Sequence, residues 1–561
     1  MPGPRFVGTL LLILSAAARS MLGQAGTPSV VNSRADLREI VRVIDSVHPW
    51  PWRRISADSF HHTATRLARS MPSVAPDRIA TDMMRLVAML QDGHTSLFPS
   101  GQQAFTWWFP IRFHQFSDSL AITATDSAHA DLLAGRVLRI GGEDAAVAAA
   151  RVAALSGADN TWGGRELTGL LSNVGALKPL GLTDGRTLNV EIVDVDGSRR
   201  SVRLQPEHTE WGDPAWMQRG EMFGPPKIPV VTAFDHLAPL QYRQSRPSLP
   251  LHLRNRIPIW FTWLAEDSTI YVQSNFVQDF NGTRFAAVAD SIFAMADQRP
   301  VRRLIVDLRY NSGGDGSKLP PFVHEIIRRP RLDQPGHVVL LVGQKTFSAA
   351  VLWLSWMREH TSVVTVGEPA GAARNHSGDA TDIVLPHTQM ILQVSTLRHY
   401  GTRSDDTAHA ELPDFPVRMS AADYFAGRDP VLEFARAASD LRSLPQIALT
   451  SGLAAARTEA GHRATQFGSF TGWRLFDERE MNSAGYAALA AGGRNDAIQI
   501  FEWNTRQFPQ SGNVWDSYGE VRLANGDTAL AVASYRRAAE LDPGNQSARA
   551  IVAGLGKPKE R

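Results

Sequence analysis

Two stretches decide the fold, and they read VRRLIVDLRYNSGGDG at residues 301–316 and HVVLLVGQKTFSAAVL at residues 337–352. Each contains a short apolar run, at 304–308 and 338–342, that is bounded by turn residues and predicts a buried strand of one sheet. The first strand leads into the turn Asn-Ser-Gly-Gly, and the second leads through Ser348 into an apolar helix. A serine at such a junction can be a nucleophile with anion-stabilising N–H groups beside it, or it can simply cap the helix.

Length and composition limit the number of domains and the kinds of site that the chain can have. The chain has 561 residues, enough for three or four domains, and 43% hydrophobic residues, as in globular proteins. A net charge of +2 with no long basic run gives no reason to expect a nucleic-acid partner. Cysteine is absent, which excludes disulfides, a thiolate nucleophile, cysteine metal sites and lipid anchoring through cysteine.

Residues 1–25 resemble a secretory signal peptide, with Arg5, an apolar core at 6–18 and small residues at 23–25. The apolar core is too short to span a bilayer, although an uncleaved anchor is the alternative. We therefore expect a periplasmic or secreted protein with no membrane span after signal removal.

The rest of the chain divides by its periodicity. Residues 29–100 predict a helical domain, and residues 104–207 predict a small, mostly β module that contains the hairpin signal Asp196-Gly197. Residues 208–258 predict a linker or cover segment. Residues 259–440 alternate predicted strands, among them 269–274, 304–308 and 338–342, with helical stretches, which predicts an α/β domain with a largely parallel sheet.

A repeat marks the last part of the chain, residues 446–561. Four pairs of similar residues lie 34 positions apart: Gly485/Gly519, Ala497/Ala531, Phe501/Tyr535 and Pro509/Pro543. This period and the residue types match tetratricopeptide repeats, in which stacked helix pairs form a docking groove. Two unrelated helical hairpins are the alternative.

A serine nucleophile needs a base and donors for the oxyanion. The N–H of Ala349 at the helix start, with that of Gly313 or Gly314, can supply the donors. No lysine follows Lys345 until Lys557, so a downstream lysine base is absent. Histidine remains, and His94 on its Asp-Gly turn is the best placed, with His376 and His399 as competitors.

These segments together resemble the C-terminal-processing (tail-specific) serine protease family. The resemblance rests on VDLRYNSGG, TFSAA, VGEPAG, QDGHTS and ELPDF and covers about residues 35–435. It implies a crotonase-like (ClpP/crotonase) α/β core, Ser348 as nucleophile and Ala349 N–H as an oxyanion donor. It also implies that the β module is PDZ-like.

The branches of this family use different catalytic bases. The processing branch has a lysine in the segment after the nucleophile, and this chain has no lysine there. The family includes the tricorn protease core and the interphotoreceptor retinoid-binding proteins. Its tricorn-like branch uses a histidine from an Asp-Gly-His-Thr type segment, which implies His94 as the base here. The orienting acid is then Asp406, ahead of Asp405 and Glu411. Thr95 or Ser96 could hold the histidine or contact the substrate, and Glu368 is expected to fix a loop.

The sequence therefore predicts an exported serine endopeptidase that cleaves peptides or unfolded proteins through an acyl-enzyme, without a metal or organic cofactor. A non-catalytic protein that binds apolar ligands or peptides on the same scaffold is the second hypothesis. A scaffold in which the repeats hold a protein partner is the third.

Overall fold

The structure is a computed structural model, which describes residues 30–208, 231–232, 250–254, 257–470 and 472–555. The chain forms two compact units, each built from separate segments. The first unit comprises residues up to 241 with 371–410 and 420–426, and the second comprises 242–370, 411–419 and 427–561. The predicted signal peptide and most of the predicted linker lie outside the described residues. In the described part of the chain, no helix has both the length and the apolar character needed to cross a membrane.

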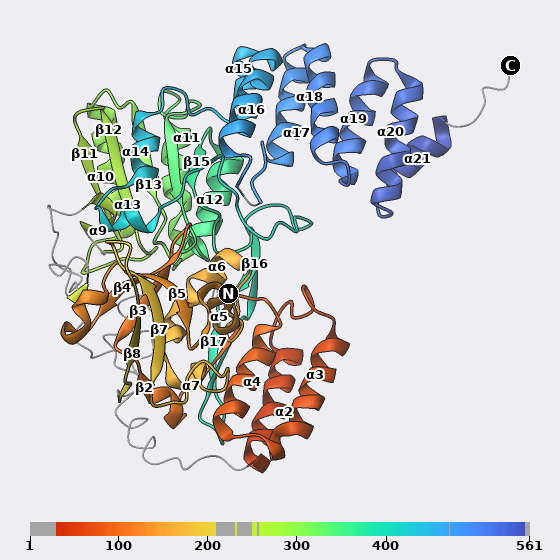
Figure 1. The fold of residues 1–561 in the computed structure, drawn as a ribbon. Helices are drawn as coiled ribbons and strands as arrows, with labels where there is room; N and C mark the ends of the chain where they lie inside the picture. The colour runs from red at the N-terminus through yellow and green to blue at the C-terminus, as the bar shows by residue number, and fades with distance from the viewer. Residues whose placement is uncertain (1–29, 209–230, 233–249, 255–256, 471, 556–561) are drawn as a thin grey trace, which may run out of the picture. The chain divides into compact units, whose positions relative to one another are not determined.

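The second unit is built on a six-stranded sheet in the order β11-β12-β13-β14-β15-β20 (Figure 1). Only β11 is antiparallel to its neighbour; the other strands are parallel. The strands are β11 (Ile259–Leu264), β12 (Thr269–Ser274), β13 (Arg303–Asp307), β14 (Val338–Val342), β15 (Val364–Gly367) and β20 (Phe415–Pro416). The central strands are buried at every position, as expected for a parallel sheet covered on both faces.

Helices cover both faces of this sheet. On one face lie α10 (Phe285–Gln298), α11 (Pro320–Ile327) and α12 (Ala349–His360), and the rings of Phe322 and Trp353 meet there at 4.9 Å between centroids. On the other face, α14 (Pro430–Ala437) packs its apolar side chains against β13, β14 and β15. The prediction of a mixed α/β fold is therefore confirmed, and the predicted strands at 269–274 and 338–342 have the predicted bounds.

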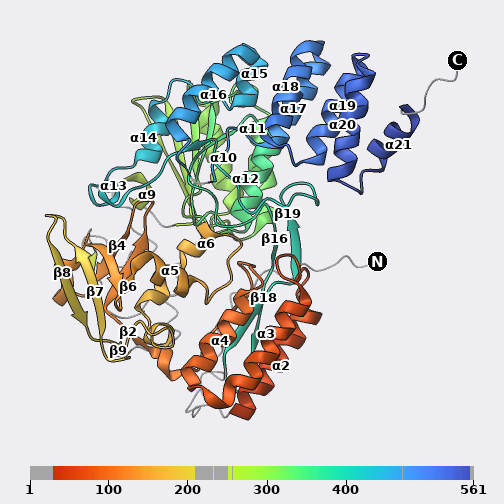
Figure 2. The ribbon, with the colours of Figure 1, turned by 45° about the vertical axis from the view of Figure 1, so that its right-hand side comes forward.

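The end of the second unit is a row of helices, which follow one another along the chain (Figure 2). They are α15 (Leu444–Ser451), α16 (Leu453–Phe467), α17 (Glu478–Ala490), α18 (Arg494–Gln507), α19 (Gly512–Ala524), α20 (Thr528–Leu541) and α21 (Gln546–Leu555). A Cβ atom on Gly485 would lie 2.7 Å from the ring of Phe501, and one on Gly519 would lie 3.1 Å from the ring of Tyr535. The glycine and the aromatic residue therefore meet in the same way in both copies of the 34-residue period.

The first unit begins with three helices, α2 (Val30–Ser46), α3 (Ala57–Ser70) and α4 (Pro76–Ala88), as the helical periodicity predicted. Next comes β1 (Ser96–Phe98), which pairs with β18 (Ile391–Val394), and β18 pairs in turn with β17 (Thr381–Val384). Two further strands, β16 (Asn375–Gly378) and β19 (Leu397–Tyr400), pair with each other. Residues 371–410 thus belong to the unit of the N-terminal helices, although the sequence places them within 259–440.

The β module of the first unit has a sheet in the order β10-β4-β5-β7-β8, with β3 and β6 at its sides. The strands of this sheet are β3 (Ile111–Gln115), β4 (Leu120–Thr125), β5 (Arg136–Ile140), β6 (Glu143–Asp144), β7 (Leu188–Val193), β8 (Arg199–Leu204) and β10 (Val231–Thr232). Two more strands of the module, β2 (Trp107–Trp108) and β9 (Glu207–His208), pair with each other in a separate sheet. Strands β7 and β8 form the hairpin predicted at Asp196-Gly197, and α5 (Ala145–Ala153) contacts β5.

Candidate active site

Ser348 lies in the second unit at the junction between β14 and α12. Its backbone angles are φ 53° and ψ −126°, in a region that L-residues rarely adopt. Its side chain makes no capping hydrogen bond, so the capping role considered for the sequence is not the one it plays. A strained serine at the start of a helix, half-buried and not used as a cap, has the features of a positioned nucleophile.

The turn that carries Ser348 is held by its neighbours in the sheet. Thr346 Oγ donates to the carbonyl of Leu308 at 2.8 Å and accepts from the N–H of Gly343 at 3.0 Å. The N–H of Phe347 donates to the carbonyl of Asn311 at 3.0 Å. The loops after β13 and β14 are therefore tied together at the carboxyl edge of the parallel sheet, where α/β proteins commonly build their sites.

The glycine turn after β13 lies directly against the serine. A Cβ atom on Gly313 would lie 2.5 Å from Ser348 Cβ, and its φ of 108° is unfavourable for any other residue. A Cβ atom on Gly314 would lie 2.3 Å from the carbonyl oxygen of Val277. Both positions thus require glycine for steric as well as conformational reasons.

The donors near the serine can be distinguished by their hydrogen bonds. The N–H of Gly313 already donates to Asn311 Oδ1 at 2.9 Å, and Asn311 is fixed in turn by a bond from its Nδ2 to Ser274 Oγ at 2.9 Å. The N–H groups of Gly314 and Ala349 donate to no other group among the described residues. Of the three predicted donors, Gly314 and Ala349 therefore have N–H groups left for an oxyanion.

A buried ionic network fixes the segment that leads into the glycine turn. Arg309 lies between two carboxylates, at 2.6 Å from Asp307 and 2.8 Å from Asp429. Tyr271 donates to Asp307 at 2.8 Å, and His252 Nδ1 lies 2.9 Å from Asp429. Burial raises the pKa of Asp429, but the charge of Arg309 outweighs it and holds the pKa well below its usual range. The glycine turn therefore follows a segment that buried ion pairs and hydrogen bonds hold in place.

His94 lies in the first unit, on the loop between α4 and β1. Its backbone N–H donates to Asp92 Oδ1 at 3.0 Å, and the other oxygen of Asp92 accepts from Thr95 Oγ1 at 2.7 Å and Ser395 Oγ at 2.6 Å. His48 Nε2 lies 2.8 Å from the same oxygen. Burial acts to raise the pKa of Asp92, but the hydrogen bond from His48 and the charge of His94 outweigh it and lower that pKa.

A second carboxylate joins the His94 loop to the segment after residue 370. Asp159 accepts from the N–H of Gly93 at 2.8 Å and from the N–H of Ala373 at 2.9 Å. Burial, with the nearby charge of Asp92, raises the pKa of Asp159. The loop that carries His94 is thereby held on both sides of the histidine.

The ring of His94 is stacked on His376, with 5.5 Å between centroids and 4° between planes. His376 Nδ1 lies 3.0 Å from the carbonyl of Ala373, so this nitrogen carries the proton. Burial lowers the pKa of His376 to about 3, so the ring is neutral at ordinary pH. Burial also lowers the pKa of His94, with partial opposition from Asp92. A histidine that is neutral at physiological pH can act as a general base.

The predicted acidic residues lie in different surroundings. The carboxylate of Asp406 accepts from Thr402 Oγ1 at 2.9 Å and lies 3.4 Å from Arg374. Asp405 is exposed and paired with Arg403 at 3.0 Å. Glu411 belongs to the second unit.

The remaining predicted residues also have defined contacts. Glu411 accepts from Ser355 Oγ at 3.1 Å. Ser96 Oγ accepts from the N–H of Gly157 at 3.0 Å. Glu368 accepts from Gln344 Nε2 at 3.1 Å, which is the loop contact expected of it. In the described part of the chain, no group of three or more acidic or imidazole side chains is arranged to hold a metal ion.

Sequence reasoning assigned no role to Asp92, although Asp92 lies two positions before His94 in the quoted segment. It also missed His48, Asp159 and Ser395. The only sequence signal for these residues is the Asp-Gly turn itself, because the other partners lie far away along the chain.

Comparison with known proteins gave matches among solved structures only. No family model and no curated protein matches the chain. Mature CPAF, in a complex with lactacystin, is similar with a TM-score of 0.49 and 11% identity over 72% of this chain and 97% of that chain. The photosystem II D1 C-terminal processing protease has a TM-score of 0.32 and 12% identity, over 69% and 93% of the two chains. The tricorn protease has a TM-score of 0.30 and 10% identity, over 72% and 36%.

Proposed function

We propose that the protein is a serine endopeptidase of the C-terminal-processing protease family, with Ser348 as nucleophile and His94 as general base. The observation that carries this proposal is the arrangement around Ser348. The serine has a strained backbone at the start of α12, lies against Gly313, and has the N–H groups of Gly314 and Ala349 beside it without another acceptor among the described residues. This combination is what acyl transfer requires.

The proposed reaction has two steps. His94 takes the proton of Ser348 Oγ while this oxygen attacks the peptide carbonyl, and the N–H groups of Gly314 and Ala349 bind the oxyanion. His94 then gives the proton to the leaving amine, which leaves an acyl-enzyme on Ser348. A water molecule, deprotonated by His94, then attacks the ester carbonyl, and His94 gives that proton to Ser348 Oγ as the carboxylic acid product leaves.

The proposal assigns positioning of the base to Asp92, because its carboxylate binds the backbone of His94. Asp406 remains the candidate for an orienting acid on the motif alone, with Asp405 and Glu411 behind it. The N–H of Gly313 supports the turn through Asn311 rather than serving as a donor.

The proposal also includes an assignment for each domain of the chain. It comprises a crotonase-like core, a PDZ-like module over 104–207, tetratricopeptide repeats over 446–561 and export through the signal at 1–25. The repeated contacts of Gly485 with Phe501 and of Gly519 with Tyr535 support the repeat assignment. The substrates are peptides or unfolded proteins, and the repeats are a surface for a protein partner.

The first test is covalent labelling with a fluorophosphonate probe, combined with hydrolysis of an unfolded protein such as casein. We expect Ser348→Ala to abolish labelling and to reduce kcat by about 10⁴-fold or more while the circular dichroism spectrum is unchanged. Ser312→Ala is the matched control, since Ser312 is exposed in the neighbouring turn and should keep both signals. Turnover in Ser348→Ala, or a wild-type protein that is not labelled, contradicts the proposal.

A double variant tests whether the two residues act in one step. His94→Ala should cost about as much as Ser348→Ala, and the double variant should be no worse than either single one. Independent, multiplicative losses would mean that His94 does not activate Ser348.

A further inference from the structure

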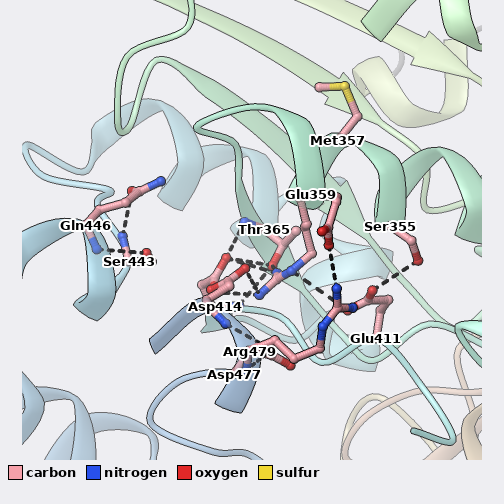
Figure 3. Close-up of polar contacts among 12 residues, drawn as sticks. Ser355, Met357, Glu359, Thr365, Glu411, Asp414, Ser443, Gln446, Asp477 and Arg479 are labelled. Atoms are coloured by element: carbon pink, nitrogen blue, oxygen red, sulfur yellow. Dashed lines mark hydrogen bonds and ion pairs between the residues drawn. The ribbon is translucent and has the colours of Figure 1, made fainter. Parts of the chain in front are cut away.

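The helix that begins at Ser348 ends in a cluster of charged residues. Near the end of α12, Arg358 lies 3.2 Å from Asp414 and 2.7 Å from Glu480, which is in the first turn of α17. The next residue, Glu359, accepts from Arg479 of α17 at 2.7 Å, and Figure 3 shows these two side chains facing each other. Two consecutive residues of α12 are thus paired with two consecutive residues of the C-terminal helices.

The Arg358 contact is largely buried. Its side chain is 8% exposed, and those of Glu411 and Asp414 are 3% and 7% exposed. Asp414 is itself fixed by the backbone N–H and the hydroxyl of Thr365 on β15, at 2.8 and 2.9 Å. The guanidinium therefore joins the nucleophile helix, the sheet and α17 at one point.

Around Arg358, the cluster holds more acidic than basic side chains. Arg358 faces three carboxylates: Glu411 at 3.8 Å, Asp414 and Glu480. Burial raises the pKa of Glu480, with the charge of Asp414 adding to the effect and that of Arg358 opposing it. Because three acidic side chains surround Arg358, its guanidinium can keep an acidic partner even when one of these contacts is lost.

Other contacts connect the same helices to the core. Gln446 of α15 forms a capping box with Ser443 (Figure 3). Gln446 also donates to the carbonyl of Ser362, just after α12. Phe467 at the end of α16 is part of the hydrophobic cluster beneath the sheet. Within α12, Ser355 Oγ donates to Glu411 at 3.1 Å (Figure 3). The helices from α15 onward are therefore joined to the catalytic layer by several contacts that reach α12 or its end.

We propose that the C-terminal helices are a positioning domain for the nucleophile: the ion pairs between α12 and α17 hold the helix whose first turn presents Ser348 and the Ala349 N–H. This inference rests on the proposed function and adds a role for the repeats beyond holding a partner. A helix is stiff along its axis, so a shift of its last turn is transmitted to its first turn. The residues involved are positioning residues, since none of them touches the reacting atoms.

The partly exposed pair Glu359–Arg479 gives the cleanest test, because its side chains are 47% and 27% exposed and their replacement should not prevent folding. We expect Glu359→Arg and Arg479→Glu each to lower kcat by about two- to fivefold with KM unchanged. The double variant, in which the charges are exchanged, should return to within about twofold of wild type. Arg537→Glu is the matched control, because Arg537 pairs with Glu540 of its own helix and should have no effect.

Hydrogen–deuterium exchange of residues 349–360 in the full chain supplies a readout that does not need activity. We expect exchange in this segment to increase in each single variant and to recover in the double variant. If the wild-type protein is not labelled by the fluorophosphonate but the variants show this exchange pattern, the proposed function is refuted while the contact between α12 and α17 still stands. Single variants with unchanged kcat, whether or not their Tm falls, or a double variant that fails to recover, would overturn the positioning role.

Discussion

The turn of Ser348 and the loop of His94 are held in place by different means. The serine turn is fixed by backbone hydrogen bonds and by glycines that leave no room for a side chain. The histidine loop is fixed by buried side chains from distant parts of the chain: His48 is 44 positions from Asp92, and Ser395 is 303 positions from it. The first region depends on steric fit between two adjacent strands, and the second depends on charge and hydrogen bonding.

Because the two regions are held differently, substitutions in them should have different effects. A change in the serine turn should move Ser348 together with the neighbouring N–H groups of Gly314 and Ala349, because the hydrogen-bonded backbone of the two loops connects them. A change in the histidine network should leave the turn intact and alter the orientation or protonation of one ring. Variants of the two regions should therefore differ in size of effect, in pH dependence and in rescue by conservative replacement.

Among the residues that hold the two regions in place, rather than Ser348 and His94 themselves, the largest effect is expected from Gly313→Ala. The added methyl group would meet Ser348 Cβ, and the φ of 108° would be strained, so the turn must shift. Since a displacement of about 1 Å in a reacting group can cost about 100-fold, kcat should fall by about that factor or more. Steady-state hydrolysis and the rate of fluorophosphonate labelling measure the loss.

Gly282→Ala is the matched control for this variant. Gly282 also has a positive φ, 77°, but a Cβ atom there meets nothing within 4 Å. It should lose stability through backbone strain alone and keep its kcat. Equal losses of kcat in the two variants would mean that the contact with Ser348 is unimportant.

A smaller effect is expected from Asp92→Asn. The amide cannot accept all the hydrogen bonds that the carboxylate accepts, and it leaves His48 without a charged partner. We expect kcat to fall by about 10- to 100-fold, more than in Asp406→Asn, because Asp92 binds the backbone of His94 directly. A larger loss in Asp406→Asn would instead identify Asp406 as the acid on which the base depends.

The same carboxylate makes a prediction about stability. The pKa of Asp92 in the folded protein lies below its ordinary value of 3.8, so its contribution to stability is present above pH 3.8 and is lost as the pH falls below it. The Tm difference between wild type and Asp92→Asn should therefore shrink as the pH is lowered through this range. A difference that stays constant would show that the carboxylate is not charged in the folded state.

The serine turn could be predicted from the sequence more completely than the network around the His94 loop. The strands at 269–274 and 338–342 and the serine turn were predictable because apolar runs and glycine turns are local signals. The membership of residues 371–410 was not, because it depends on pairing between β1 and β18, almost 300 positions apart. For the same reason no local pattern could show that Asp159 or Ser395 supports the His94 loop.

The smallest expected effect concerns the stacked pair, and it separates packing from protonation. His376→Ala removes a ring worth about 0.5–1.5 kcal/mol of aromatic contact, so kcat/KM should fall by about two- to tenfold. It also admits water to His94, and because burial is what lowers the pKa of His94, the acid limb of the pH profile should move toward higher pH.

His376→Phe restores the stacked ring without a titratable nitrogen, and it should restore both the rate and the position of the acid limb. The bond of His376 to the carbonyl of Ala373 is lost in both variants, so it cannot explain a difference between them. If His376→Phe behaves like His376→Ala, the ring nitrogen rather than the stack supports the base, and the neutral imidazole would then be a hydrogen-bonding partner of the loop. If neither variant changes the acid limb, then this limb does not report the protonation of His94. The His94 loop would then have a structural role only, and His94 would not be the base that activates Ser348.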